Sequence, residues 1–161
     1  MSLPYEEVLQ GAPLVRSSPG SRHEHICERL HGCVHASVAN LTSTTLLPKR
    51  SAVRVAPDTV LRPDLALVTI PASRLWLAAE IVNSEDHAPD TVVKKQIYEE
   101  IRLPRLWMID PRYDNVEVYH STEYGMVLKA ILAGGELLNE KLLPQFQITI
   151  SELFKTPSAQ G

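Results

Sequence analysis

The feature that most constrains this chain is the run of residues 75–82, in which every residue is apolar except Glu80. Such a run between turn-forming residues is typical of a strand that is buried on both faces of a sheet. A carboxylate in a strand of this kind costs several kcal/mol unless it is paired or bound to a metal ion. The run therefore predicts a central strand with a charged site near its end.

Length and composition predict one ordinary folded domain. The chain has 161 residues, of which 44% are hydrophobic and 22% are charged, and this length suits a single core. No apolar run approaches the roughly 18 residues that cross a bilayer. Only Cys27 and Cys33 are available for disulfide pairing, and no secretion leader opens the sequence. We therefore expect a cytoplasmic protein without membrane contact.

Three segments are expected along the chain. Residues 1–20 are expected to form an N-terminal segment with a short helix at residues 5–9, before a stretch rich in proline, glycine and serine. Residues 21–155 are expected to form one domain, and residues 156–161 a flexible polar tail.

The first long helix is predicted over residues 21–38. Its apolar positions recur every four residues, at Ile26, Leu30, Val34 and Val38. Ser21 and Glu24 have the spacing of a capping box at its start. One face of this helix is therefore expected to pack on the core.

Other apolar segments predict strands over residues 52–55, 65–70, 106–109, 116–119, 125–132 and 146–150. The first two of these strands are expected to pair like a hairpin. A second helix is predicted over residues 92–101, with Lys94 and Tyr98 on one side. This order of elements predicts an α/β fold in which a mixed β-sheet is flanked by helices.

Two carboxylates are expected to converge at one edge of this sheet. Asp64 begins one strand, and Glu80 lies near the end of the neighbouring buried strand. Hydrolysis of a phosphodiester requires charge neutralisation and an activated water, and a divalent cation held by carboxylates supplies both. The backbone carbonyl of Ile81 adds a third oxygen of the kind that such cations prefer.

Lys94, one turn into the following helix, is expected to hold the attacking water or to stabilise negative charge in the same cleft. A simpler interpretation remains open, in which Asp64 caps a turn after Pro63, Glu80 pairs with a lysine and Lys94 is a solvated helix residue. Taken together, the residues favour a catalytic site, because a carboxylate in so apolar a strand requires a partner.

Four motifs carry a resemblance to a known family. They are RPDL at residues 62–65, AEIVNS at residues 79–84, Lys94 four residues before Tyr98, and LWMIDP at residues 106–111. In this order and spacing they resemble the Uma-two family of bacterial restriction endonucleases, within the PD-(D/E)XK nuclease superfamily. The closing segments LPQF at residues 143–146 and ELF at residues 152–154 are also similar to that family.

The resemblance implies a restriction-endonuclease-like core, a divalent cation that is Mg²⁺ or Mn²⁺, and DNA as the substrate. It also implies that His23, in the first helix, reaches the metal cleft beside Asp64 and Glu80. The superfamily pattern has a lysine two residues after the glutamate, where this chain has Val82. In this family Lys94 is expected to reach the same space from its helix.

The histidines suggest a zinc site as an alternative. His23, Cys27, His31 and His35 recur every four residues along one stripe of the predicted helix, and pairs with this spacing can chelate zinc. No CxxC or HExxH pattern completes a closed site. We expect instead that Cys27 is buried, that His31 and His35 are partly exposed, and that His23 alone faces the cleft.

The net charge of −3 argues against a protein that coats nucleic acid through a basic surface. The cluster of Lys49, Arg50, Arg54 and Arg62 predicts either a local rim that faces phosphate or an ordinary solvated surface. No base-reading motif is present, so a partner is expected to supply specificity. An enzyme that cuts both strands is expected to be a homodimer. The competing hypothesis is a catalytically weak module of the same fold that binds DNA or protein.

Overall fold

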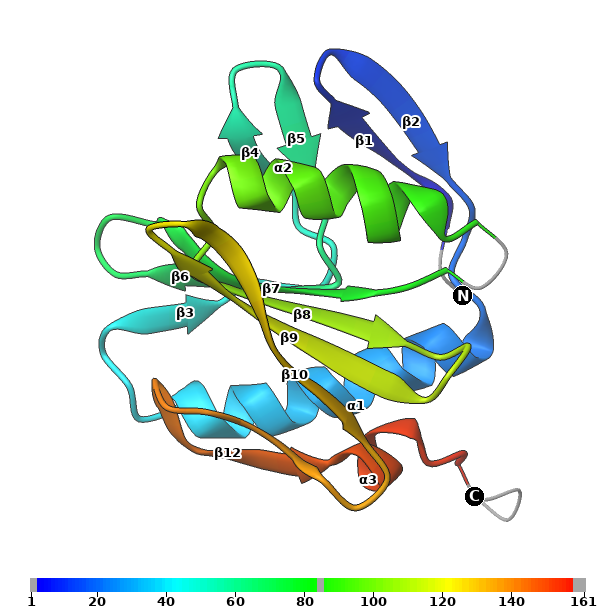
Figure 1. The fold of residues 1–161 in the computed structure, drawn as a ribbon, viewed down its shortest axis with the longest axis vertical. Helices are drawn as coiled ribbons and strands as arrows, with labels where there is room; N and C mark the ends of the chain where they lie inside the picture. Colours follow the sequence, from blue (N-terminus) through cyan, green and yellow to red (C-terminus); the bar gives the residue numbers. More distant parts are fainter. Residues whose placement is uncertain (1–2, 84–85, 158–161) are drawn as a thin grey trace.

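The computed structural model describes residues 3–83 and 86–157, and its centre is a mixed sheet of six strands (Figure 1). The strand order is β10-β9-β8-β7-β6-β3. The bounds are β3 (Thr44–Leu46), β6 (Leu65–Thr69), β7 (Leu75–Ile81), β8 (Arg105–Asp110), β9 (Asn115–Thr122) and β10 (Gly125–Ala133). Only β7 and β8 pair in parallel, and the other neighbours are antiparallel.

Helices cover both faces of this sheet, as the sequence predicts. Helix α1 (Ser21–Val38) lies on one face, and α2 (Lys95–Glu100) lies on the other (Figure 1). A π-helical turn, η1 (Pro89–Lys94), leads directly into α2. Together η1 and α2 form the crossover that a parallel pair such as β7 and β8 requires. No helix in the described ranges is long and apolar enough to span a membrane.

Strand β7 is buried on both of its faces, which confirms the prediction for the apolar run. Leu77 and Ala79 belong to the core cluster that contacts α1. Ala78 belongs to the second cluster, which packs around α2. Glu80 is 2% exposed in this surrounding, so its carboxylate depends on partners from the protein or from a ligand.

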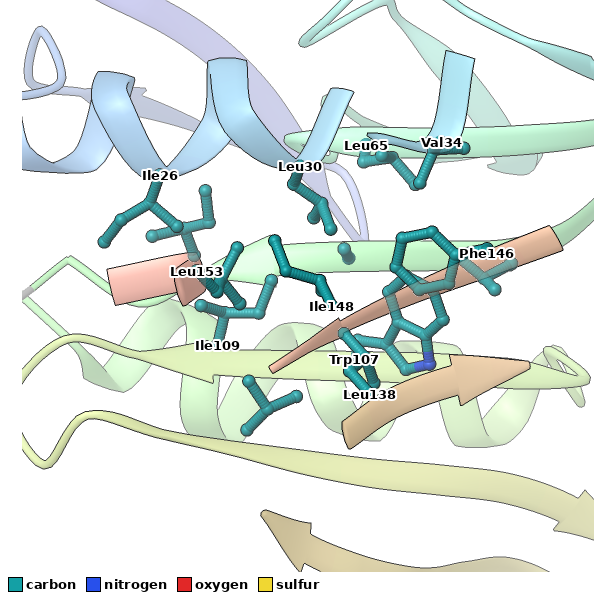
Figure 2. Close-up of a cluster of buried hydrophobic side chains, with 14 of the residues drawn as sticks. Ile26, Leu30, Val34, Leu65, Trp107, Ile109, Leu138, Phe146, Ile148 and Leu153 are labelled. Atoms are coloured by element: carbon teal, nitrogen blue, oxygen red, sulfur yellow. The ribbon is translucent and has the colours of Figure 1, made fainter. Parts of the chain in front are cut away.

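Helix α1 has the predicted bounds and packs through the predicted stripe. Ile26, Leu30 and Val34 are almost completely buried and face the sheet (Figure 2). The predicted capping box is wrong, because Gly20 is the N-cap and makes no side-chain cap hydrogen bond. Glu24 instead accepts hydrogen bonds from Lys49 and Arg50.

The prediction of a helix at residues 5–9 is wrong, because these residues form a strand. A second sheet has the order β2-β1-β5-β4 and comprises β1 (Tyr5–Leu9), β2 (Ala12–Arg16), β4 (Val53–Ala56) and β5 (Thr59–Leu61). Gln10 and Gly11 both have positive φ values, and such a two-residue turn matches the twist of a hairpin. Pairing with β2 and β5 therefore overrides the local sequence preference.

Two further details differ from the sequence predictions. The segment at residues 52–55 was expected to pair with that at 65–70, but β4 pairs with β5 in the second sheet, and β6 pairs with β3 and β7. The predicted helix at residues 92–101 begins earlier, at Pro89, and ends at Glu100. The short turn at Pro57 and Asp58 lets β4 pair with β5. Closing this short loop costs less conformational entropy than closing the longer loop to β6.

The C-terminal elements pack in the same core cluster as α1. They are β11 (Leu137–Glu140), β12 (Leu143–Thr149) and α3 (Ile150–Phe154). Phe146 of β12 stacks on Trp107 of β8 with 5.4 Å between ring centroids, and both lie in the cluster of Figure 2. Trp107 is completely buried, so it is a packing residue with no exposed surface on which a base could stack.

Replacing Thr149 by alanine should lower the free energy of unfolding by about 1 kcal/mol, because this residue caps α3. The Thr149 hydroxyl accepts a hydrogen bond from the Glu152 N–H at 3.1 Å. Denaturant melts of Thr149→Ala and of Ser151→Ala, at an exposed position of the same helix, measure the difference. Equal midpoints for the two variants would show that the cap contributes nothing.

Candidate active site

Asp64 and Glu80 come together where β6 begins and β7 ends. These strands are antiparallel, with Leu65 opposite Ala79. Asp64 directly precedes Leu65 and Glu80 directly follows Ala79, so the two acidic residues lie at adjoining ends of paired strands. Both side chains are 2% exposed. The predicted convergence of the two acidic residues thus follows from the strand register.

The carboxylate of Asp64 is bound by three different segments. Its Oδ2 atom accepts the Ile81 N–H at 2.8 Å, and its Oδ1 atom accepts Nη1 of Arg50 at 3.0 Å. His23 Nε2 lies 3.5 Å from Oδ2. Burial by itself raises the pKa of this carboxyl, but the charge of His23, its hydrogen bond and the Ile81 N–H bring the pKa down to about 2. Asp64 is therefore ionised at neutral pH.

His23 lies beside the predicted metal ligands, at the start of α1. Its Nε2 atom lies 3.1 Å from the carbonyl oxygen of Ile81. Burial disfavours the charged ring, yet the charge of Asp64 outweighs it and raises the pKa of His23 above its ordinary value. The geometry thus joins His23 to the acidic pair, as the family resemblance implies.

Glu80 is held by two residues of the crossover. Lys94 Nζ donates to Oε1 at 2.7 Å, and the Tyr98 hydroxyl donates to Oε2 at 2.5 Å. Burial and the nearby acidic side chains together raise the pKa of the Glu80 carboxyl to about 8, against the opposing charge of Lys94. Lys94 and Tyr98 lie on one side of the crossover as predicted, whereas Lys95 points to the ring of Tyr119.

The sequence did not predict a group of buried charges that extends this site. Lys94 Nζ also lies 2.8 Å from Oε2 of Glu7, and Arg16 bonds both Glu7 and Asp90. Asp90 lies in the first turn of η1, whose N-cap is Ala88. Charged residues in short segments are normally read as exposed, so no signal in the sequence singles out Glu7.

Two clefts open beside the site, and Tyr5 lines both of them. One has a volume of about 330 Å³ and is lined by Arg22, His23 and the end of β7. The other has a volume of about 670 Å³, and its lining includes Lys49, Arg50 and Arg62. The predicted basic rim therefore exists in part. Its fourth member, Arg54, instead binds the carbonyl of Pro57.

Comparison with known proteins identifies the family and the fold. A family model described as "Uma2: Putative restriction endonuclease" matches residues 3–151. The chain belongs to the Uma2 family. A crystal structure described as a putative nuclease belonging to DUF820 from Anabaena variabilis has the same fold, with a TM-score of 0.75 and 17% sequence identity over 94% of this chain and 90% of that chain. No curated protein sequence matches.

Two residues of the helical stripe that suggested zinc as an alternative contact the protein backbone. Among residues 3–83 and 86–157, no group of three or more His, Cys, Asp or Glu side chains is placed to hold a metal ion. Cys27 Sγ and His31 Nε2 instead contact the backbone carbonyl of Asp64, at 3.6 Å and 2.7 Å. These contacts fix the backbone of Asp64, in the RPDL motif, to α1.

A cation with oxygen ligands fits the remaining donors better. Asp64, Glu80 and the Ile81 carbonyl supply hard oxygen atoms, and Oδ1 of Asp64 and both oxygens of Glu80 have a second lone pair beyond their present hydrogen bond. Mg²⁺ commonly uses one or two carboxylates and completes its shell with water and substrate phosphate. The positive charge of such a cation would also favour the ionised form of Glu80, whose pKa is raised by burial and by neighbouring acidic side chains.

Proposed function

We propose that this Uma2 protein is an endonuclease that hydrolyses DNA phosphodiester bonds with Mg²⁺ or Mn²⁺. Asp64, Glu80 and the carbonyl oxygen of Ile81 would hold the cation. The observation that carries the proposal is the buried pair of carboxylates at the adjoining ends of β6 and β7. When bound, such a cation neutralises charge on the phosphate and lowers the pKa of a coordinated water.

Lys94 and His23 have distinct roles in this proposal. The charges of Glu80 and Glu7 outweigh the effect of burial on Lys94 and raise its pKa, so its ammonium can orient the attacking water or stabilise negative charge. His23 keeps Asp64 ionised through its charge and hydrogen bond. The basic side chains of the larger cleft would contact phosphates beyond the reacting one.

The proposal includes the setting in which the protein acts. A cytoplasmic homodimer would present two sites related by a two-fold axis, which matches the symmetry of duplex DNA. Sequence preference would come from an additional partner, because the known DNA-reading motifs are absent from the sequence.

One observation favours the alternative of a catalytically weak module that binds DNA or protein. Each carboxylate oxygen of Asp64 and Glu80 already accepts a hydrogen bond from the protein. A site whose donors stay in place would keep the fold and the clefts without admitting a cation. The alternative therefore predicts binding without metal-dependent turnover.

Removal of the metal distinguishes the endonuclease from the catalytically weak binding module. Purified protein is expected to nick plasmid DNA and to cut duplex oligonucleotides in Mg²⁺ or Mn²⁺, and to lose this activity in excess EDTA. The Glu80→Gln variant, purified in parallel, controls for a contaminating nuclease. Cleavage that persists equally in EDTA or in the variant would refute the proposal. DNA binding without any cleavage would support the weak module.

A further inference from the structure

Glu7 is a fully buried acidic residue that the reaction proposed above does not use. It lies in β1, in the N-terminal hairpin, and none of its surface is exposed. Its Oε2 atom lies 2.8 Å from Lys94 Nζ and accepts the Arg62 N–H at 2.7 Å. Its Oε1 atom accepts Nη1 of Arg16 at 2.9 Å. Both oxygens therefore have strong donors.

Each of these bonds leads to a segment that carries a proposed site residue. Arg62 stands two positions before Asp64 in the sequence. Lys94 itself is the proposed cationic group. Glu7 thus connects the segment before β6 with the end of η1, although the two are separated by the whole of β6 and β7.

The third bond reaches the remaining segment through Arg16. Its guanidinium binds both oxygens of Asp90, at 3.0 Å and 2.9 Å. Asp90 Oδ2 also accepts the N–H of Asn83 at 3.1 Å, three residues after Glu80. The hairpin residues Glu7 and Arg16 therefore hold the start of η1 against the end of β7.

Lys94 is shared between Glu7 and Glu80, at 2.8 Å and 2.7 Å. A lysine side chain is a point charge on a flexible stem of four carbons, so its position depends on its partners. Any cation bound to Glu80 competes with Lys94 for that carboxylate. Glu7 then remains as the counter-charge that keeps the ammonium in the site.

We propose that Glu7 is a positioning residue that fixes Lys94 in the active site and locks the N-terminal hairpin onto the three site segments. The inference rests on the proposed nuclease function for its catalytic consequence. It makes β1 and β2 part of the support of the active site.

The test is the Glu7→Gln variant, which keeps the shape of the side chain and removes its charge. Its kcat for DNA cleavage in Mg²⁺ is expected to fall about 10- to 100-fold, as for other residues that orient a catalytic group, while KM stays within about twofold. Glu6→Gln, at the exposed neighbouring position, is the matched control. Glu7→Asp restores the charge and should recover part of kcat.

A second measurement follows Lys94 directly. In protein labelled with ¹⁵N-lysine, the ammonium of Lys94 is expected to give a signal protected from exchange, because this side chain is fully buried; Lys94→Arg assigns it by its loss. Glu7→Gln should shift or broaden this signal, and Glu6→Gln should leave it unchanged. If Glu7→Gln fails to fold, the same comparisons are made with Glu7→Asp.

An unchanged kcat, or an unchanged Lys94 signal, in a folded Glu7 variant would overturn the inference. If the unaltered protein cuts no DNA at all, the proposed function fails. The ammonium signal alone then decides whether Glu7 positions Lys94, so the two failures are distinguishable.

Discussion

Cleavage of DNA by the Asp64→Asn variant is expected to be at least about 1000-fold slower than by the unaltered protein, in the same Mg²⁺ buffer. A cation held by this carboxylate would contribute several kcal/mol of transition-state stabilisation, and about 4 kcal/mol corresponds to this factor. The asparagine oxygen can still accept the Ile81 N–H, which Asp64 binds at 2.8 Å. The loss should therefore appear in the rate of nicking of a supercoiled plasmid while the fold persists.

The matched control for this experiment is Asp58→Asn, which makes the same chemical change at an exposed turn between β4 and β5. It should cut at the unaltered rate. Circular dichroism of both variants shows whether the fold is kept. A folded Asp64→Asn protein that cuts within about tenfold of the unaltered rate would exclude Asp64 as a metal ligand.

Replacement of Lys94 by methionine should cost about 3–5 kcal/mol of the free energy of unfolding, because it leaves two buried carboxylates without their shared cation. Lys94 is completely buried between Glu7 and Glu80. Methionine has a similar length but no charge, so the acidic groups would face each other in an apolar surrounding. For a chain of this size the midpoint of thermal unfolding should fall by about 10 °C.

Lys95→Met is the natural comparison, because it removes the next lysine in the chain. Lys95 is only partly buried, and its ammonium lies 4.5 Å from the centre of the Tyr119 ring. Loss of such a contact costs about 1 kcal/mol or less. Calorimetric melts that give the two variants equal stability would contradict the charge pairing described for Lys94.

The elements that the sequence predicts well are those in which local pattern and tertiary packing agree. The stripe of Ile26, Leu30 and Val34 has helical spacing, and the sheet buries that same stripe. The apolar run around Glu80 predicts β7 because no other element type suits a short segment buried on both faces. In both cases the sequence pattern that indicates burial lies within a single helix or strand.

The N-terminal hairpin is harder to predict because its stability comes from distant residues. Tyr5–Leu9 contains two glutamates that favour neither a strand nor a buried position. Its conformation depends on pairing with β2 and β5, and Glu7 is buried because Arg16, Arg62 and Lys94 surround it. Such contacts cannot be read from spacing along the chain.

For the candidate site, the chemistry of Asp64 and Glu80 could be inferred from burial and strand order. The choice of Lys94 over Lys95 and the inclusion of His23 came from the family resemblance, because neighbouring lysines differ only in which way they point. The structure places both residues against the acidic pair. Arg50, which binds Asp64, could be predicted only as one member of a basic cluster.

The long sequence separation within the buried charge network has a consequence for synthesis of the protein. Asp90 follows its partner Arg16 by 74 residues. At about 5–20 residues per second, a ribosome takes roughly 4 to 15 seconds to add that length of chain. During this time the hairpin with its Glu7–Arg16 pair has been made, while their further partners Asp90 and Lys94 have not. A nascent chain therefore cannot assemble the complete network of buried charges until translation has passed Lys94.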